Sequence, residues 1–128
     1  MAVLWVGWML LPGQVESSHA ASVTIYWTAP GDDGNTGTAT SYDVRYSTSA
    51  ITVGNWSSAT TVTGEPAPSI AGSNESMTVS GLVSDTQYYF AIITSDEVSN
   101  LSGLSNVLAI ATDDESPPAA ITDLSATP

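Results

Sequence analysis

The stretch Gly81–Ile92, GLVSDTQYYFAI, most constrains the fold of this chain. A Gly-Leu pair closes an apolar segment, and the serine and aspartate that follow supply turn chemistry. Tyr88, Phe90 and Ile92 then alternate with outward positions, which is the period of a half-buried strand. The ring of Tyr88 suits a core above Leu82, but its hydroxyl needs a partner, which backbone across the corner can supply. This corner predicts a β-sandwich.

The same period-two alternation recurs along the chain and predicts further strands with one buried face. Trp27 closes the first of these segments and is expected to anchor the core. A last strand is expected over residues 106–112. The inward positions expected outside the corner are Val23, Ile25, Trp27, Tyr42, Val44, Tyr46, Met77, Val79, Leu108 and Ile110.

The expected strands are short, turn signals separate them, and no window shows helical periodicity. A parallel sheet would need crossover helices, so an antiparallel arrangement is favoured. The fold class predicted is all-β, an immunoglobulin-like antiparallel β-sandwich of about seven strands.

Composition limits the size, the stabilisation and the partners of the domain. A chain of 128 residues that is 42% apolar suits one domain with flanking tails. There is no cysteine, so packing rather than disulfides must stabilise it. Thirteen carboxylates face one basic side chain, Arg45, and the formal charge of -12 disfavours nucleic acid and anionic membranes as partners. The acidic, lysine-free composition is compatible with surroundings outside a cell.

The first twenty residues allow three interpretations. Met1–Leu11 is a long apolar run that is too short to span a bilayer. It resembles the apolar part of a signal peptide, although no Lys or Arg precedes it. Alternatively, Leu10–Val15 forms a first edge strand, where Pro12 is tolerated because an edge N–H need not pair. A third interpretation is an artificial start inside a longer gene.

These features together resemble a fibronectin type III domain over roughly residues 10–112. Trp27, the row Tyr42, Val44 and Tyr46, the run VSGL and the run TQYYF follow the pattern of that family in order and spacing. WTAPGDDG and SDEVSNLSGLSN are similar to its bacterial variety. The resemblance implies strands A, B and E in one sheet and C, C′, F and G in the other, with Tyr88 at a tyrosine corner. The segment expected for strand A, MLLPGQVESSHA, departs from the family pattern.

Residues 113–128 form an acidic linker followed by the beginning of another repeat. PPAAITDLSATP, at residues 117–128, looks like the opening strand of a following domain of the same type. Such a repeat cannot fold after one strand, so the chain is interpreted as part of a tandem array. Neighbouring domains of the same protein are therefore the expected partners, and Ile121 and Leu124 are expected to be mobile or to contact a neighbour.

No residue pattern points to catalysis. His19 is the only histidine, and no nucleophile-elbow sequence accompanies it. Paired carboxylates occur, but nothing predicts the cleft that glycosidase chemistry needs. The chain is therefore expected not to be an enzyme and to need no cofactor, apart from the calcium discussed next.

One metal hypothesis follows from the resemblance, which places the B-C and F-G loops at the same pole. Asp32, Asp33 and Asn35 of the first loop would then lie near Asp96 and Glu97 of the second, with Asn100 close by. Carboxylate and amide oxygens suit calcium. The alternative interpretation is that these residues are turn formers that accept hydrogen bonds from nearby backbone.

The function predicted is a non-catalytic spacer or adhesion module of a larger secreted or surface protein. The domain is expected to be a monomer that does not insert into membranes. The alternative is a module that binds calcium, a protein or a glycan through its B-C and F-G loops. A flat patch formed by Tyr26, Tyr89 and Trp56 would favour sugar stacking.

Overall fold

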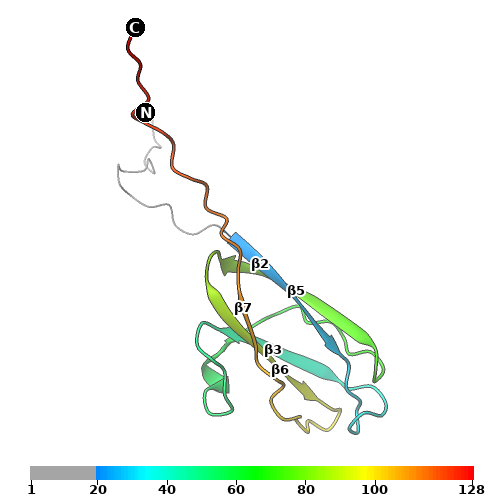
Figure 1. The fold of residues 1–128 in the computed structure, drawn as a ribbon. Helices are drawn as coiled ribbons and strands as arrows, with labels where there is room; N and C mark the ends of the chain where they lie inside the picture. The colour runs from blue at the N-terminus through cyan, green and yellow to red at the C-terminus, as the bar shows by residue number, and fades with distance from the viewer. Residues whose placement is uncertain (1–19) are drawn as a thin grey trace, which may run out of the picture.

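The computed structural model describes residues 20–128 and shows two antiparallel β-sheets packed face to face (Figure 1). The smaller sheet pairs β2 (Ala20–Thr28) with β5 (Asn74–Val83). A turn of 3-10 helix, η2 (Trp56–Ser58), precedes the edge strand of the larger sheet. In spatial order, the larger sheet contains β4 (Thr60–Thr61), β3 (Ser41–Ser47), β6 (Gln87–Ser95) and β7 (Leu108–Ala111).

The predicted all-β sandwich is confirmed. β2 and β5 stand where the resemblance implied strands B and E, and the other sheet holds the strands expected as C, C′, F and G. Strand A, expected near Leu10–Val15, lies outside the described residues, as do His19 and the signal-like run Met1–Leu11. Within residues 20–128 there is no helix that is long and apolar enough to cross a bilayer.

Alternation along each strand builds a single core between the sheets. In a strand, every second side chain points to the same face, so one row per strand is buried. Val44, Phe90 and Leu82 are the most completely buried large side chains. The buried cluster consists of Val23, Ile25, Tyr42, Val44, Met77, Val79, Leu82, Tyr88 and Phe90.

Trp27 and Tyr46 pack against this cluster at partial burial instead of lying inside it. The Trp27 ring meets Tyr42 edge-on, with ring centroids 5.1 Å apart. Tyr46 packs edge-on against Tyr88 at 5.6 Å and lies 5.9 Å from Phe90. Such offset aromatic pairs add packing energy beyond burial alone. Trp27 was expected in the core, but it lies at the rim because β2 has a paired neighbour, β5, on one side only within the described residues.

Leu108 and Ile110 face the core as expected, but they are not buried. By register these residues do share the inner face, because they pair with Phe90 and Tyr88 of β6. They nevertheless remain 40% and 37% exposed. The reason is position: β7 is an edge strand that pairs with β6 on one side only in the part of the chain that the structure describes.

The corner between β5 and β6 has the predicted hydrogen bond. The backbone N–H of Val83 donates to the hydroxyl of Tyr88 at 2.9 Å. Asp85 turns the chain with a positive φ of 51°, a conformation that aspartate tolerates better than most residues. Leu82 lies buried in the cluster next to the turn. The hydroxyl therefore supplies an acceptor for the N–H of Val83, the last residue of β5.

Replacing Tyr88 by Phe removes this acceptor and keeps the ring. The N–H of Val83 then loses its partner, and we expect the free energy of unfolding to fall by about 1 to 3 kcal/mol. Chemical denaturation measures this change. Tyr26→Phe is the matched control, because Tyr26 is 77% exposed and should leave the midpoint unchanged. Equal midpoints for Tyr88→Phe and the wild type would contradict the role of the corner.

Candidate functional site

The loop after β2 is folded back on itself and presents Asp32 at one end of the sandwich. The N–H groups of Asp32 and Asp33 both donate to the carbonyl of Thr36, at 2.8 and 3.1 Å. Gly31 lies so close to Thr36 that a Cβ there would overlap its backbone, so only glycine fits. This small hairpin holds the Asp32 side chain in one place.

The loop after β6 is organised by Asp96. Its Oδ1 accepts hydrogen bonds from the N–H groups of Val98 at 3.0 Å and Asn100 at 2.7 Å. Its Oδ2 accepts from the side-chain amide of Asn100 at 2.7 Å. Asp96 therefore forms the turn in the way that the alternative interpretation anticipated. The same bonds place Glu97 at the start of the loop.

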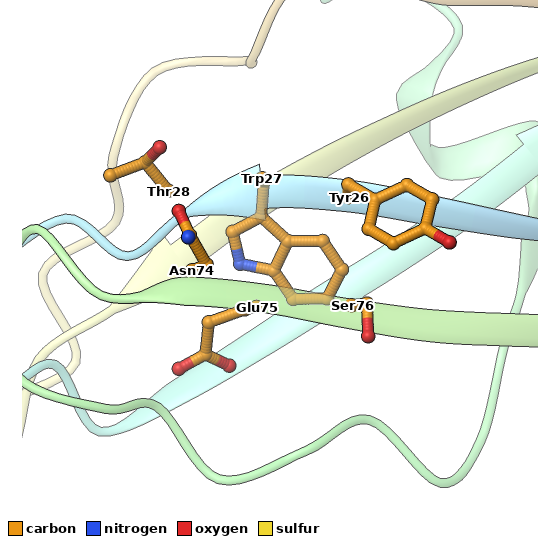
Figure 2. A pocket seen from close by; sticks show the side chains of 6 residues that line it. All are labelled: Tyr26, Trp27, Thr28, Asn74, Glu75 and Ser76. Carbon is orange, nitrogen blue, oxygen red and sulfur yellow. The ribbon is translucent and has the colours of Figure 1, made fainter.

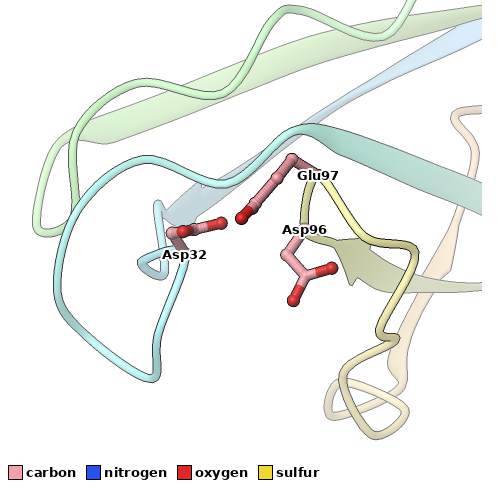
Figure 3. Close-up of side chains that lie close together, drawn as sticks. All are labelled: Asp32, Asp96 and Glu97. Carbon is pink, nitrogen blue, oxygen red and sulfur yellow. The ribbon is translucent and has the colours of Figure 1, made fainter.

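The two loops bring three carboxylates together. One oxygen from each of Asp32, Asp96 and Glu97 lies within 4.8 Å of the others. Figure 3 shows the Glu97 side chain reaching towards Asp32 across the gap between the loops, with Asp96 beside them. Asp32 and Asp96 are half-buried and Glu97 is exposed. Such a group of hard oxygen ligands suits a divalent cation such as calcium.

Electrostatics within the cluster differ from one carboxylate to the next. A hydrogen bond shared with Glu97 raises the pKa of Asp32 above its ordinary value, and burial and the neighbouring negative charges add to the rise. Oδ1 of Asp32 is shielded from solvent and accepts no hydrogen bond among the described residues. Desolvation raises the pKa of Asp96, but hydrogen bonds from Asn100 and Val98 outweigh it and hold that pKa below its ordinary value. Hydrogen bonds therefore favour the charged form of Asp96, whereas the surroundings of Asp32 disfavour its charged form.

Two of the five residues predicted as calcium ligands do not join this group. Asp33 pairs its backbone with Thr36, and both Asp33 and Asn35 are exposed on the hairpin. Sequence spacing identified the two loops, but it could not tell which side of the hairpin faces Asp96. The predicted calcium site stays a prediction, now reduced to Asp32, Asp96 and Glu97.

A second hollow lies on the smaller sheet, where Trp27, Tyr26 and Thr28 face Asn74, Glu75 and Ser76 (Figure 2). Glu75 is buried and accepts a hydrogen bond from the N–H of Ser69 at 2.6 Å. Burial raises the pKa of Tyr42, and the nearby charge of Glu75 adds to the rise. Glu75 was not among the residues predicted from the sequence, although its place two residues before Met77 puts it on the inward face of β5.

Tyr26, Tyr89 and Trp56 do not form the common patch that would favour sugar stacking. Tyr26 points outward from β2, on the smaller sheet. Tyr89 alternates with the core residues of β6 and so faces outward from the larger sheet. Trp56 is covered by the guanidinium of Arg45, which lies 4.6 Å from its ring centroid. Tyr26 and Tyr89 are therefore on opposite outer faces.

Comparison with known proteins agrees with this architecture. The family model for the fibronectin type III domain matches residues 12–110. The chain is similar to chitinase A1 of Niallia circulans, with 38% identity over 92 residues. The match covers 72% of this chain and 10% of that protein, so the chain spans only a small part of its relative. No solved structure gives a significant match. The chain belongs to the fibronectin type III family, and the predicted resemblance to its bacterial variety is confirmed.

Replacing Asp32 by Asn tests the electrostatics of the cluster. Because the folded state raises the pKa of Asp32, its ionised form opposes folding at neutral pH, and this penalty disappears as the pH falls through that pKa. We therefore expect Asp32→Asn to raise the melting temperature at pH 7 in the presence of a chelator. The difference from the wild type should shrink on acidification. A variant that melts earlier than the wild type at pH 7 would contradict this account.

Asp96→Asn is the matched control, and its expected effect has the opposite sign. The folded state lowers the pKa of Asp96, so its charge stabilises the fold above the ordinary pKa, and this contribution is lost as the pH falls through the lowered pKa. The substitution should therefore lower the melting temperature at pH 7.

Added calcium should raise the melting temperature of the wild type and not that of Asp32→Asn, because a ligand of the folded state stabilises by mass action.

Proposed function

We propose that this domain is a non-catalytic spacer module of a larger extracellular protein. The observation that carries the proposal is the way the chain leaves the sandwich. A spacer must transmit a fixed orientation to the next segment, and this requires the last strand and the first linker residues to be held by the domain. The contacts of Thr112 and Asp113 meet that requirement.

Thr112 is buried and hydrogen-bonded to the corner between β5 and β6. Its hydroxyl donates to the carbonyl of Val83 at 2.7 Å and accepts from the N–H of Thr86 at 3.0 Å. Its own N–H donates to the carbonyl of Thr86 at 2.9 Å. One residue further, the carbonyl of Asp113 accepts from the N–H of Asp85 at 3.0 Å. The base of the linker is therefore part of the folded domain.

The outer faces of the sandwich support the same function. Hydroxyl pairs tie neighbouring strands, with Thr24 bonded to Thr78 at 2.7 Å and Ser41 to Ser95 at 2.6 Å. The one basic side chain, Arg45, is engaged by Asp43 at 3.0 Å and by the carbonyl of Trp56 at 3.1 Å. Polar, hydrogen-bonded faces of this kind favour a surface that stays in solvent.

The proposed parent protein is an extracellular enzyme that acts on a polysaccharide, with its catalytic groups in another part of the chain. The relative named chitinase A1 supports this choice, since the aligned region is 10% of that protein. The charge of -12 supports a role away from anionic surfaces.

A second candidate function is calcium binding at the pole that carries Asp32, Asp96 and Glu97. Their close approach within 4.8 Å favours it. Calcium there would join the two loops and stiffen the end of the sandwich, a role that is compatible with a spacer. Sugar binding through aromatic stacking has no comparable support, because Tyr26 and Tyr89 face opposite sides.

Replacing Thr112 by Val tests the fixed exit. Valine has the same shape but lacks the hydroxyl, so we expect a loss of about 1 to 3 kcal/mol in the free energy of unfolding. Backbone relaxation measured by NMR should show faster motion at Asp113. Thr112→Ser keeps the hydroxyl and is the matched control. Unchanged relaxation at Asp113 in Thr112→Val would count against the proposed orientation of the linker.

Incubation with insoluble chitin separates a spacer from a glycan-binding module. A spacer should remain in the supernatant at every concentration of polysaccharide, with and without calcium. Retention on the chitin pellet that is lost in Tyr26→Ala or Tyr89→Ala would overturn the spacer proposal. Circular dichroism of both variants checks that they remain folded.

A further inference from the structure

The smaller sheet has a free edge along β5. Within residues 20–128, β5 pairs only with β2, so alternate residues of β5 direct their N–H and C=O groups away from the sheet. The first strand of a fibronectin type III domain pairs with the strand equivalent to β2. The family match that begins at residue 12 therefore leaves the edge of β5 free.

The middle of β5 lacks the features that usually protect such an edge. Natural edge strands are often very short or carry lysine or proline, which hinder pairing with another chain. β5 has 10 residues and is the longest strand in the part of the chain that the structure describes. Its stretch Ser76–Ser80, SMTVS, contains neither a proline nor a charged side chain. This stretch can therefore accept another extended strand.

The hollow beside the free edge is uncharged. Tyr46 and the run Thr61–Thr63 line it from the side of the larger sheet, and the run Thr78–Ser80 lines it from β5. In a chain with a formal charge of -12, two copies repel each other wherever their carboxylates meet. Along this flank, two copies can approach without bringing carboxylates face to face.

The sequence of the stretch is complementary to itself. Hydroxyl and apolar side chains alternate in SMTVS symmetrically about Thr78. If two copies pair antiparallel with Thr78 opposite Thr78, Ser76 lies opposite Ser80 of the second copy, and Met77 lies opposite Val79. Hydroxyls then meet on the outer face and apolar groups on the inner face, which continues the burial pattern that β5 already has. This symmetry favours a second copy over an unrelated partner.

We propose that this chain forms a symmetric dimer in which the edge of β5 pairs antiparallel with the edge of β5 in a second copy. The two smaller sheets then join into one, in the order β2, β5, β5, β2. Main-chain hydrogen bonds supply the affinity, and the match of side chains fixes the register.

This two-fold contact uses the same edge of both copies, so assembly stops at two. The contact is small, because each copy contributes one short stretch, and association is expected only at high concentration. The dimer replaces the monomer expected from the sequence.

Sedimentation analysis of the full chain tests the proposal from micromolar to millimolar concentration, in salt that screens the repulsion between copies. The weight-average mass should rise from the monomer value of 13.2 kDa towards twice that value and not beyond it. Thr78→Glu should abolish the rise, because two added carboxylates would face each other across the two-fold axis.

Thr24→Glu is the matched control. The hydroxyls of Thr24 and Thr78 bond to each other at 2.7 Å, so the two variants lose the same hydrogen bond and add the same charge to the same face. Only Thr78 lies on the strand with the proposed contact, so Thr24→Glu should keep the rise in mass.

Disulfide crosslinking provides an independent arm, because the chain contains no cysteine of its own. In the proposed pair, the Cα atoms of the two Thr78 residues are about 4.5 to 5.5 Å apart, within the range that a disulfide spans. Thr78→Cys should therefore form a covalent dimer on mild oxidation, under conditions in which Thr24→Cys stays monomeric.

Circular dichroism checks that each variant is folded, and the cysteine variants keep the test informative if a glutamate variant unfolds. A chain that stays monomeric at millimolar concentration would overturn the proposal. So would a mass beyond two copies, association that survives Thr78→Glu, or equal crosslinking of Thr78→Cys and Thr24→Cys.

Discussion

The hydrogen bond from the N–H of Val83 to the hydroxyl of Tyr88 is the interaction on which the rest of the structure depends. It joins the last residue of β5 to the second residue of β6 and so fixes how one sheet continues into the other. Leu82 is buried beside the turn, and the Tyr88 ring packs against Tyr46 at 5.6 Å. The corner therefore sets the separation of the sheets and the register of the core together.

The same corner also controls where the chain leaves the domain. Val83 and Thr86, which flank the turn, are the partners of the Thr112 hydroxyl, and Asp85 is the partner of Asp113. The segment that contains Tyr88 and stabilises the sandwich therefore also holds the base of the linker through hydrogen bonds. This links the stability of the sandwich to the orientation of whatever follows it, which is the property that a spacer needs.

The two poles of the domain have different chemistry. One pole holds the corner and the linker, with its polar groups satisfied by hydrogen bonds. The other pole collects Asp32, Asp96 and Glu97 without a basic side chain among them. Loops at that pole are positioned by their own backbone hydrogen bonds, so carboxylates can be held close despite their repulsion. Neutralising that charge, by protons or by a cation, is the simplest way in which solution conditions can alter this domain.

Local pattern alone determined the strands, the corner and the family, because period-two alternation and turn residues are short-range signals that one strand carries by itself. The Tyr88 hydroxyl partner followed from the same signals. Only the tertiary structure decided that Asp32, and not Asp33, joins Asp96 and Glu97, and that Leu108 stays partly exposed. Each of these depends on which segments become neighbours across the sandwich or at its edges. That information lies in the packing of distant residues, which no single stretch of sequence contains.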